Sequence, residues 1–221
     1  MIDYGLHELW ATPIVKVKNP DHGQIKQALV QFSYDSEKRA GMAVESGVTP
    51  HLKNALYEST MDIFNSTPLP EMKALLNFCL RSVGEVAAQL RKKLHPQDPP
   101  LPGIGVVIHE SWIHVTRDRG YHDMHTHPNC SWCGIYTIEP GDCDPKSLNG
   151  NNRFDSPIEP AYIDLGSDAY ITSSMYVCPE DGLLVLFPSY LRHSAVPYAG
   201  SRDRIVLAFN SRVFRPDPSQ T

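Results

Sequence analysis

A cluster of prolines between residues 96 and 102 divides the sequence into two regions with different hydrophobic patterns. Before it, apolar residues recur at three- and four-residue steps from Met72 to Leu94, which is the period of an amphipathic helix. After it, short runs rich in Val, Ile and aromatic residues alternate with clusters of turn-forming residues. Helices followed by many short strands are typical of helices packed against a β-sandwich or jelly roll. We therefore predict an α+β protein that is mainly β.

The length of 221 residues suits one domain with a core of ordinary size, and no internal repeat or linker indicates a second. We expect residues 1–221 to form a single domain, with about 1–100 as helical support plus a first strand and about 101–215 as the jelly-roll core. The N-terminal helices should then pack on one sheet. Whether they also cap a site or form a homodimer surface is left open by the sequence.

Individual elements follow from local patterns. In the first half we expect a strand within Leu9–Val17, a helix over 20–33, a polar loop to residue 50, a second helix between Leu52 and Phe64, and a third ending near Leu94. In the second half we expect strands at Ile104–Thr116, Ser131–Ile138, Ala161–Thr172, Gly182–Phe187, Ser194–Tyr198 and Arg204–Phe214.

Composition and charge argue against several classes of function. A formal net charge of −5 does not favour nucleic acid, whose phosphates need a basic face. There is no run of about 18 apolar residues for a membrane span, and the first residues do not resemble a signal peptide, so we expect a cytoplasmic protein. Five cysteines, an odd number, indicate free thiols rather than a disulfide framework.

Three histidines form a candidate metal site. His125 and His127 are two residues apart, so in a strand both side chains would point to the same side. His193 follows the apolar run that ends at Pro188 and precedes another strand-like segment, which would let it supply a third ligand. The alternative is three unrelated histidines with hydrogen-bonded or surface positions. The paired spacing and the matching flanking strands favour the metal site.

Arg204 is the candidate anion-binding residue. It lies eleven residues after His193 and begins the apolar run Ile-Val-Leu-Ala-Phe. A buried arginine cannot lose its proton and therefore needs an anionic partner. That partner is either a ligand carboxylate bound by two hydrogen bonds or an acidic side chain of the protein itself.

Two segments resemble a known family. His125-Thr-His-Pro-Asn-Cys-Ser-Trp-Cys-Gly-Ile-Tyr-Thr-Ile138 resembles the H-x-H-P-x-x-x-W-S-G-V-Y-Y signature of a family of 2-oxoglutarate/Fe(II)-dependent oxygenases with an HxH…H motif. Leu186–His193 and Arg204–Asn210 are similar to its second block, and the likeness extends over about residues 103–214. It implies a double-stranded β-helix (a cupin-like jelly roll) with Fe(II) as cofactor and 2-oxoglutarate as cosubstrate.

The resemblance also implies roles for single residues. His125, His127 and His193 become iron ligands, and Arg204 binds the distal carboxylate of 2-oxoglutarate. Asn210 and Tyr136 become candidates for the cosubstrate pocket, although Tyr136 suits core packing equally well. Asn129 either contacts the cosubstrate or forms a Pro-Asn turn, and the turn is favoured. The implied reaction uses dioxygen to hydroxylate a small-molecule or amino-acid-like substrate.

One departure from the wider superfamily concerns His127. The common iron site has two histidines and a carboxylate in the order H-x-D/E…H, whereas here an imidazole takes the middle position. The site is then one unit more positive, which favours a dianionic cosubstrate. Asp123 is two residues before His125 and is either an alternative ligand or a partner that orients an imidazole.

Other readings of the same residues remain. Cys130-Ser-Trp-Cys133 with the nearby histidines is compatible with structural zinc, but no second cysteine pair follows. The polar segment 142–152 lacks the spacing of a calcium loop and is interpreted as a turn. Two rival functions are a three-histidine dioxygenase that does not use 2-oxoglutarate and a non-catalytic metal-binding jelly roll.

Overall fold

A computed structural model describes residues 11–45, 52–53, 55–99, 103–158, 162–168 and 174–216. Its helices are α1 (His22–Glu45), α2 (Ile63–Ser66), α3 (Pro70–Leu94) and α4 (Leu165–Asp168). Its strands are β1 (Val15–Lys18), β2 (Leu52–Lys53), β3 (Leu56–Glu58), β4 (Gly105–Thr116), β5 (His122–His125), β6 (Trp132–Glu139), β7 (Asn152–Asp155), β8 (Ser174–Val177), β9 (Leu183–Pro188), β10 (His193–Ala195) and β11 (Arg204–Phe214).

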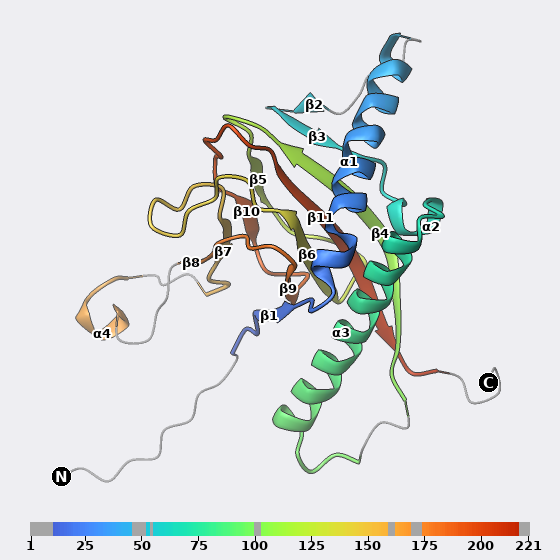
Figure 1. Cartoon of the computed structure of the whole chain (residues 1–221). Coiled ribbons are helices and arrows are strands. Elements are labelled where there is room, and N and C mark those ends of the chain that lie inside the picture. Colours follow the sequence, from blue (N-terminus) through green and yellow to red (C-terminus); the bar gives the residue numbers. More distant parts are fainter. Residues whose placement is uncertain are drawn as a thin grey trace.

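The strands form two sheets. The larger has seven strands in the order β1-β9-β6-β11-β4-β3-β2, and the smaller has four in the order β5-β10-β7-β8. Neighbouring strands are antiparallel in both sheets. Figure 1 shows the two long helices on one side of the large sheet and the small sheet on the other. This is the mainly β jelly roll that the sequence predicts, with N-terminal helices on one sheet.

The central strands of the large sheet are covered on both faces. All six residues of β9 are buried, and β11 is buried from Arg204 to Ser211. Strands with two covered faces have continuous apolar runs rather than alternation, which is why both stand out in the sequence. Within β11, Ile205, Leu207 and Phe209 belong to the core under the helices. The alternate positions Arg204, Val206 and Ala208 line a pocket on the opposite face, between the sheets.

Helix α3 matches its prediction from sequence. It begins at Pro70, whose fixed φ and missing N–H are tolerated at the first helical position. Glu71 in the first turn and three basic residues in the last suit the helix dipole. Its buried stripe, which includes Met72, Leu75 and Cys79, packs in the core against the large sheet. Cys79 is fully buried, as expected for a small core residue.

Helix α1 is longer than predicted. The sequence indicated a loop from residue 33, yet the helix continues to Glu45. Contacts with distant parts of the chain stabilise this polar extension. Arg117 donates two hydrogen bonds to the Glu37 carboxylate at 2.6 and 2.7 Å, and Ser36 pairs with the Tyr57 hydroxyl at 2.9 Å. Local hydrophobic periodicity carries no information about such partners.

Two further predictions were wrong in their details. The helix expected from Leu52 to Phe64 is a short hairpin, β2–β3, followed by the single turn α2. The hairpin extends the large sheet beside β4, so the first hundred residues contribute strands as well as helical support. The strand expected over Ala161–Thr172 is the single turn α4 where the structure describes it, while residues 161 and 169–172 lie outside the described residues. The first strand begins only at Val15, and residues 1–10 also lie outside.

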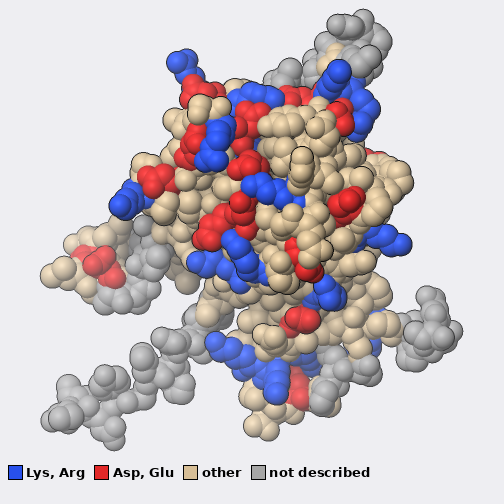
Figure 2. Space-filling view, in the orientation of Figure 1, with Lys and Arg blue, Asp and Glu red and all other residues tan. Residues whose placement is uncertain are grey.

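The surface in Figure 2 carries acidic and basic side chains interspersed with one another. Among the described residues, no helix combines the length and the apolar composition that crossing a bilayer requires.

Candidate metal centre and cosubstrate pocket

Three imidazoles converge at one end of the space between the sheets. His125 ends β5 and His193 begins β10, and the two residues are direct partners in the antiparallel pairing of these strands. His127 follows two residues after β5, where its backbone N–H bonds to the carbonyl of Ser189. One ring nitrogen from each histidine lies within 4.8 Å of the others. The predicted trio is therefore brought together by the fold.

Backbone carbonyls orient two of the rings. Nδ1 of His125 lies 2.7 Å from the carbonyl oxygen of Asp123, and Nδ1 of His193 lies 3.0 Å from that of Leu191. A carbonyl oxygen only accepts, so each Nδ1 carries the proton and each Nε2 of the neutral ring presents a lone pair. Metal-binding histidines are usually held in this way.

His127 is held differently because the chain has left the strand. Pro128 has no N–H to donate to a sheet, so the two-residue repeat of a strand does not apply beyond His125. The side-chain amide nitrogen of Asn210 lies 3.3 Å from Nδ1 of His127 and donates a 2.7 Å hydrogen bond to Glu110. The thiol of Cys133 donates to the Asn210 oxygen at 3.3 Å. Asn210 thus belongs to the surroundings of the metal centre.

The three rings are neutral at physiological pH. Burial, with the nearby His125 as a second cause, lowers the pKa of His193 to about 3 and that of His127 to about 4. Burial also lowers the pKa of His125. A metal ligand must present an unprotonated nitrogen, so the site is prepared to bind a cation without first losing protons from imidazolium.

Arg204 lies in the same pocket, on β11, and only 2% of it is exposed. Nη2 donates to the side-chain oxygen of Asn152 at 2.8 Å, while Nε is buried without a hydrogen-bond partner. In the described part of the chain no carboxylate pairs with this guanidinium. Burial lowers the pKa of Arg204, but the side chain remains a cation at neutral pH. A buried, incompletely satisfied guanidinium fits the distal carboxylate of a dicarboxylate.

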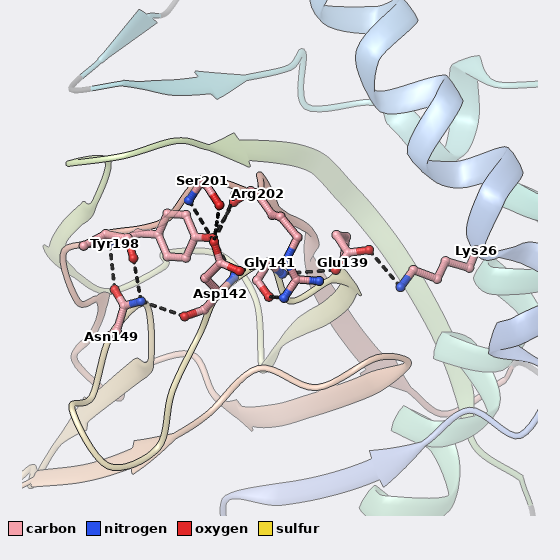
Figure 3. Close-up of polar contacts among 9 residues, drawn as sticks. Lys26, Glu139, Gly141, Asp142, Asn149, Tyr198, Ser201 and Arg202 are labelled. Carbon is pink, nitrogen blue, oxygen red and sulfur yellow. Dashed lines mark hydrogen bonds and ion pairs between the residues drawn. The ribbon is translucent and has the colours of Figure 1, made fainter.

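Two loops close the pocket behind Arg204. Gly150 has φ +65 and approaches so closely that a Cβ there would lie 3.5 Å from Cδ of Arg204 and in collision with Cys143 and Tyr198. Figure 3 shows how these loops are joined: the Asp142 carboxylate pairs with Arg202 at 2.7 Å, and the Asn149 amide donates to the carbonyls of Asp142 and Ala199. Up to residue 151 the 142–152 segment is thus a set of turns, in agreement with its interpretation from sequence, and Asn152 begins β7.

Tyr136 does not line this pocket, which corrects one expectation. On β6 it faces the helices and is fully buried. Its hydroxyl forms hydrogen bonds with the His22 ring at 2.8 Å and the Asn19 side chain at 3.1 Å. It packs edge-on to Phe78. Successive strand residues alternate between faces, so Cys133 and Ile135 face the pocket while Tyr136 faces the helical core.

Asp123 and Asn129 take supporting positions. Asp123 is exposed and lies outside the group of ligand atoms around His125, and its backbone carbonyl accepts a hydrogen bond from that ring. Asn129 is exposed with φ 60, and its carbonyl accepts a 2.7 Å hydrogen bond from Arg212, as expected for a turn residue.

The two cysteines of the Cys130–Cys133 pair are close, with their sulfur atoms 3.8 Å apart. Among the described residues they are not part of a group of three metal-ligating side chains. Burial raises the pKa of both thiols. Thiolates bind zinc, so this environment does not favour the zinc alternative.

Two features of the site were missed from sequence. Asn152, the partner of Arg204, is on β7, a short strand without a clear pattern. A second group, Glu58, His114 and His122, gathers from β3, β4 and β5. His122 belongs to the histidine-rich stretch, which was the available signal, but nothing local connects it with Glu58, 64 residues earlier in the chain.

Comparison with known proteins agrees with this geometry. Residues 110–210 match the sequence model of the family described as "Putative 2OG-Fe(II) oxygenase". No curated protein shows significant sequence similarity to this chain.

Solved structures share the fold. A prolyl-4-hydroxylase from Pseudomonas putida is 11% identical with TM-score 0.55, covering 90% of this chain and 92% of that one. HygX from Streptomyces hygroscopicus, solved with nickel, 2-oxoglutarate and hygromycin B, is 10% identical with TM-score 0.54, covering 91% and 83%. AviO1 from Streptomyces viridochromogenes Tue57 is 17% identical with TM-score 0.51, covering 94% and 91%.

The matched residues contain all three converging histidines and the buried arginine. Enzymes of this class use ferrous iron, 2-oxoglutarate and dioxygen to oxidise a small-molecule or peptide substrate. Over residues 110–210, the chain is therefore similar to the 2OG-Fe(II) oxygenase family.

Proposed function

We propose that this protein is an Fe(II)/2-oxoglutarate-dependent dioxygenase that hydroxylates a small-molecule or amino-acid-like substrate, with the whole chain acting as one oxygenase domain. The observation that supports it most is the pairing of two sites in one pocket: three neutral imidazoles and a buried guanidinium without an acidic partner among the described residues. The imidazoles suit a metal ion, and the guanidinium suits a carboxylate.

In this proposal His125, His127 and His193 hold the iron. Their ligand atoms are close enough to share one ion, and the carbonyls of Asp123 and Leu191 fix which nitrogen two of them present. Three protein ligands on one side of an ion leave its remaining positions open for other ligands. When bound, iron with 2-oxoglutarate and dioxygen supplies the oxidising chemistry, and the cosubstrate is converted to succinate and CO₂.

Arg204 holds the distal carboxylate of 2-oxoglutarate. Asn152 fixes one end of the guanidinium, and the loops around Gly150 and Tyr198 exclude water from behind it. In such a dry environment a charge-assisted hydrogen bond is stronger than in water. Asn210 orients His127 rather than contacting the cosubstrate directly, since its amide groups are engaged by Glu110, Cys133 and the ring.

The substrate side of the pocket is aromatic. Trp112 and Phe187 line it beside the metal centre, with ring centroids 5.5 Å from His127 and 4.5 Å from His193 respectively. Flat apolar rings suit a compact organic substrate held by stacking and by a small number of hydrogen bonds. These side chains therefore support a small-molecule or amino-acid-like substrate.

The test is an anaerobic titration of the Fe(II)-loaded protein with 2-oxoglutarate, following the visible charge-transfer band of the metal chelate. We expect a saturable band in the wild type and a Kd raised about 100-fold or more in Arg204→Met, because losing one member of a buried charged pair costs about 2–5 kcal/mol. Arg153→Met is the matched control, because Arg153 pairs with Asp155 on β7 and leaves Arg204 in place.

A three-histidine dioxygenase without 2-oxoglutarate predicts a different result. The protein would bind iron, show no chelate band and form no succinate, and Arg204→Met would leave oxygen consumption unchanged. That outcome would overturn the proposed use of Arg204.

A further inference from the structure

A second group of ligating side chains lies beside the first. Oε2 of Glu58 is 2.8 Å from Nε2 of His114 and 3.6 Å from Nε2 of His122. One ligand atom from each residue lies within 4.8 Å of the others. The three come from both sheets: Glu58 and His114 are direct partners across β3 and β4 of the large sheet, and His122 begins β5 of the small sheet. His114 is buried, and the other two are partly buried.

Contacts with neighbouring groups orient the two imidazoles. Nε2 of His114 donates to the Glu58 carboxylate, and burial lowers the pKa of this ring. Nδ1 of His122 lies 3.3 Å from the carbonyl oxygen of Asp123, which only accepts, so Nε2 is the atom that this ring turns towards Glu58. Both Nε2 atoms therefore face the same carboxylate oxygen, which is the arrangement that three ligands of one cation need.

The ligand types and their arrangement suit a first-row divalent ion. Two imidazoles and one carboxylate form a recurrent binding set for zinc, which takes further ligands from outside the protein. His114 and His122 also line the pocket that contains His125, so an ion that reaches the first centre can reach the second. The two groups are adjacent, since the His122 and His125 rings are 4.4 Å apart.

We propose that Glu58, His114 and His122 form a second metal site, for Zn²⁺ or a similar divalent ion, distinct from the three-histidine centre. The carbonyl oxygen of Asp123 links the two, because it accepts from Nδ1 of both His122 and His125. An ion in the second site ties β5 to β3 and β4. It thereby stabilises the end of β5 from which His125 reaches the first centre.

The test counts Zn²⁺ ions bound by the metal-free protein in isothermal titration calorimetry. The wild type should bind two equivalents. Glu58→Gln keeps the size and an acceptor oxygen of the side chain and should bind one equivalent tightly. Binding of the second Zn²⁺ should be at least about 100-fold weaker, because even residues outside the ligand set change metal affinity about 10–100-fold. Glu180→Gln, which changes an exposed glutamate paired with Lys18, should still bind two.

A second series of variants tests the Glu58, His114 and His122 site in a protein that lacks an intact three-histidine centre. His193→Ala should lose one equivalent and keep the other, and Zn²⁺ should still raise its Tm. The double variant His193→Ala/Glu58→Gln should bind none tightly, with Tm unresponsive to zinc. His122→Gln provides the same test if Glu58→Gln does not fold, as judged by circular dichroism without metal.

The outcomes distinguish the two proposals. One equivalent in the wild type, or two in Glu58→Gln with unchanged affinity, would overturn the second site. If His193→Ala instead retained both equivalents while Glu58→Gln lost one, the second site would stand and the three-histidine iron site would fail.

Discussion

Nε2 of His125 and Nε2 of His127 lie 3.1 Å apart, and the environments of the two rings differ. His125 presents a lone pair because a carbonyl holds its Nδ1 proton, whereas Nδ1 of His127 faces the N–H of Asn210. In the metal-free protein His127 therefore has its proton on Nε2 and donates it to His125. In the proposed iron site Nε2 of His127 would bind the ion, so the proton of this ring would have to move to Nδ1.

The first prediction concerns the charge of the middle ligand. His127→Asp restores the common set of two histidines and a carboxylate, so Fe(II) binding should persist while His127→Ala loses it. The added negative charge should raise the Kd for dianionic 2-oxoglutarate about tenfold, because a unit charge a few ångströms away is worth about 1 kcal/mol or more. The anaerobic chelate titration measures both. A lower Kd in His127→Asp would contradict the proposed geometry.

The second prediction concerns Asn152, which positions Arg204 through the 2.8 Å hydrogen bond from Nη2. Asn152→Ala should raise the Kd for 2-oxoglutarate about tenfold, since a hydrogen bond to a charged group contributes about 1.5–3 kcal/mol. Asn152→Asp should weaken binding further, because its carboxylate would neutralise the guanidinium. Fe(II) affinity, measured separately, should stay within about twofold in both variants. An equal loss in iron affinity would show that Asn152 only maintains the fold.

The third prediction distinguishes the effect of side-chain size at Cys133 from the effect of its hydrogen bond. Its thiol donates to the Asn210 oxygen, and that amide contacts His127. Cys133→Ser keeps a donor and should leave iron affinity within about threefold. Cys133→Ala leaves a buried acceptor unsatisfied, which costs about 1–3 kcal/mol, and should lower both Tm and iron affinity. Identical behaviour of the two variants would show that the hydrogen bond does not matter.

The fourth prediction tests the close approach of β6 and β11. A Cβ at Gly134 would lie 2.8 Å from Cε2 of Phe209 and closer still to Cζ, and Phe209 is fully buried. Gly134→Ala should lower the free energy of unfolding in urea by about 1–3 kcal/mol through overpacking. Gly41→Ala is the control: a Cβ there meets nothing within 4 Å, and in a helix alanine should stabilise by about 1 kcal/mol.

The fifth prediction is a pH dependence of the metal-free protein. The folded pKa of His193 is about 3, against 6.5 for an unperturbed histidine. Below pH 6.5 the unfolded chain therefore binds more protons than the native state, so stability falls as pH falls from about 6.5 towards 3. For His193 the loss between pH 7 and pH 5 is about 2 kcal/mol. Urea unfolding at the two pH values measures it, and His193→Asn should show a smaller difference.

The hydrophobic patterns account for much of the fold. The three-and-four-residue stripe predicted α3, and the continuous apolar runs predicted β4, β6, β9 and β11. Where tertiary contacts decide the conformation, local patterns were misleading. The second half of α1 is stabilised by Arg117 and Tyr57, and β2–β3 is strand because it pairs with β4. Short strands such as β7 are too brief to show a period.

The sequence by itself determined which residue types are available for a metal and a carboxylate, because the histidine pair, His193 and Arg204 stand in recognisable local contexts. The tertiary structure decided which of them meet. It turned Tyr136 towards the helices, because the alternation of side chains along β6 places that position in the core under the helices. It also placed Asn152 on Arg204 and Glu58 beside His114 and His122. These contacts join residues far apart in the chain, and only the pairing register of the strands determines them.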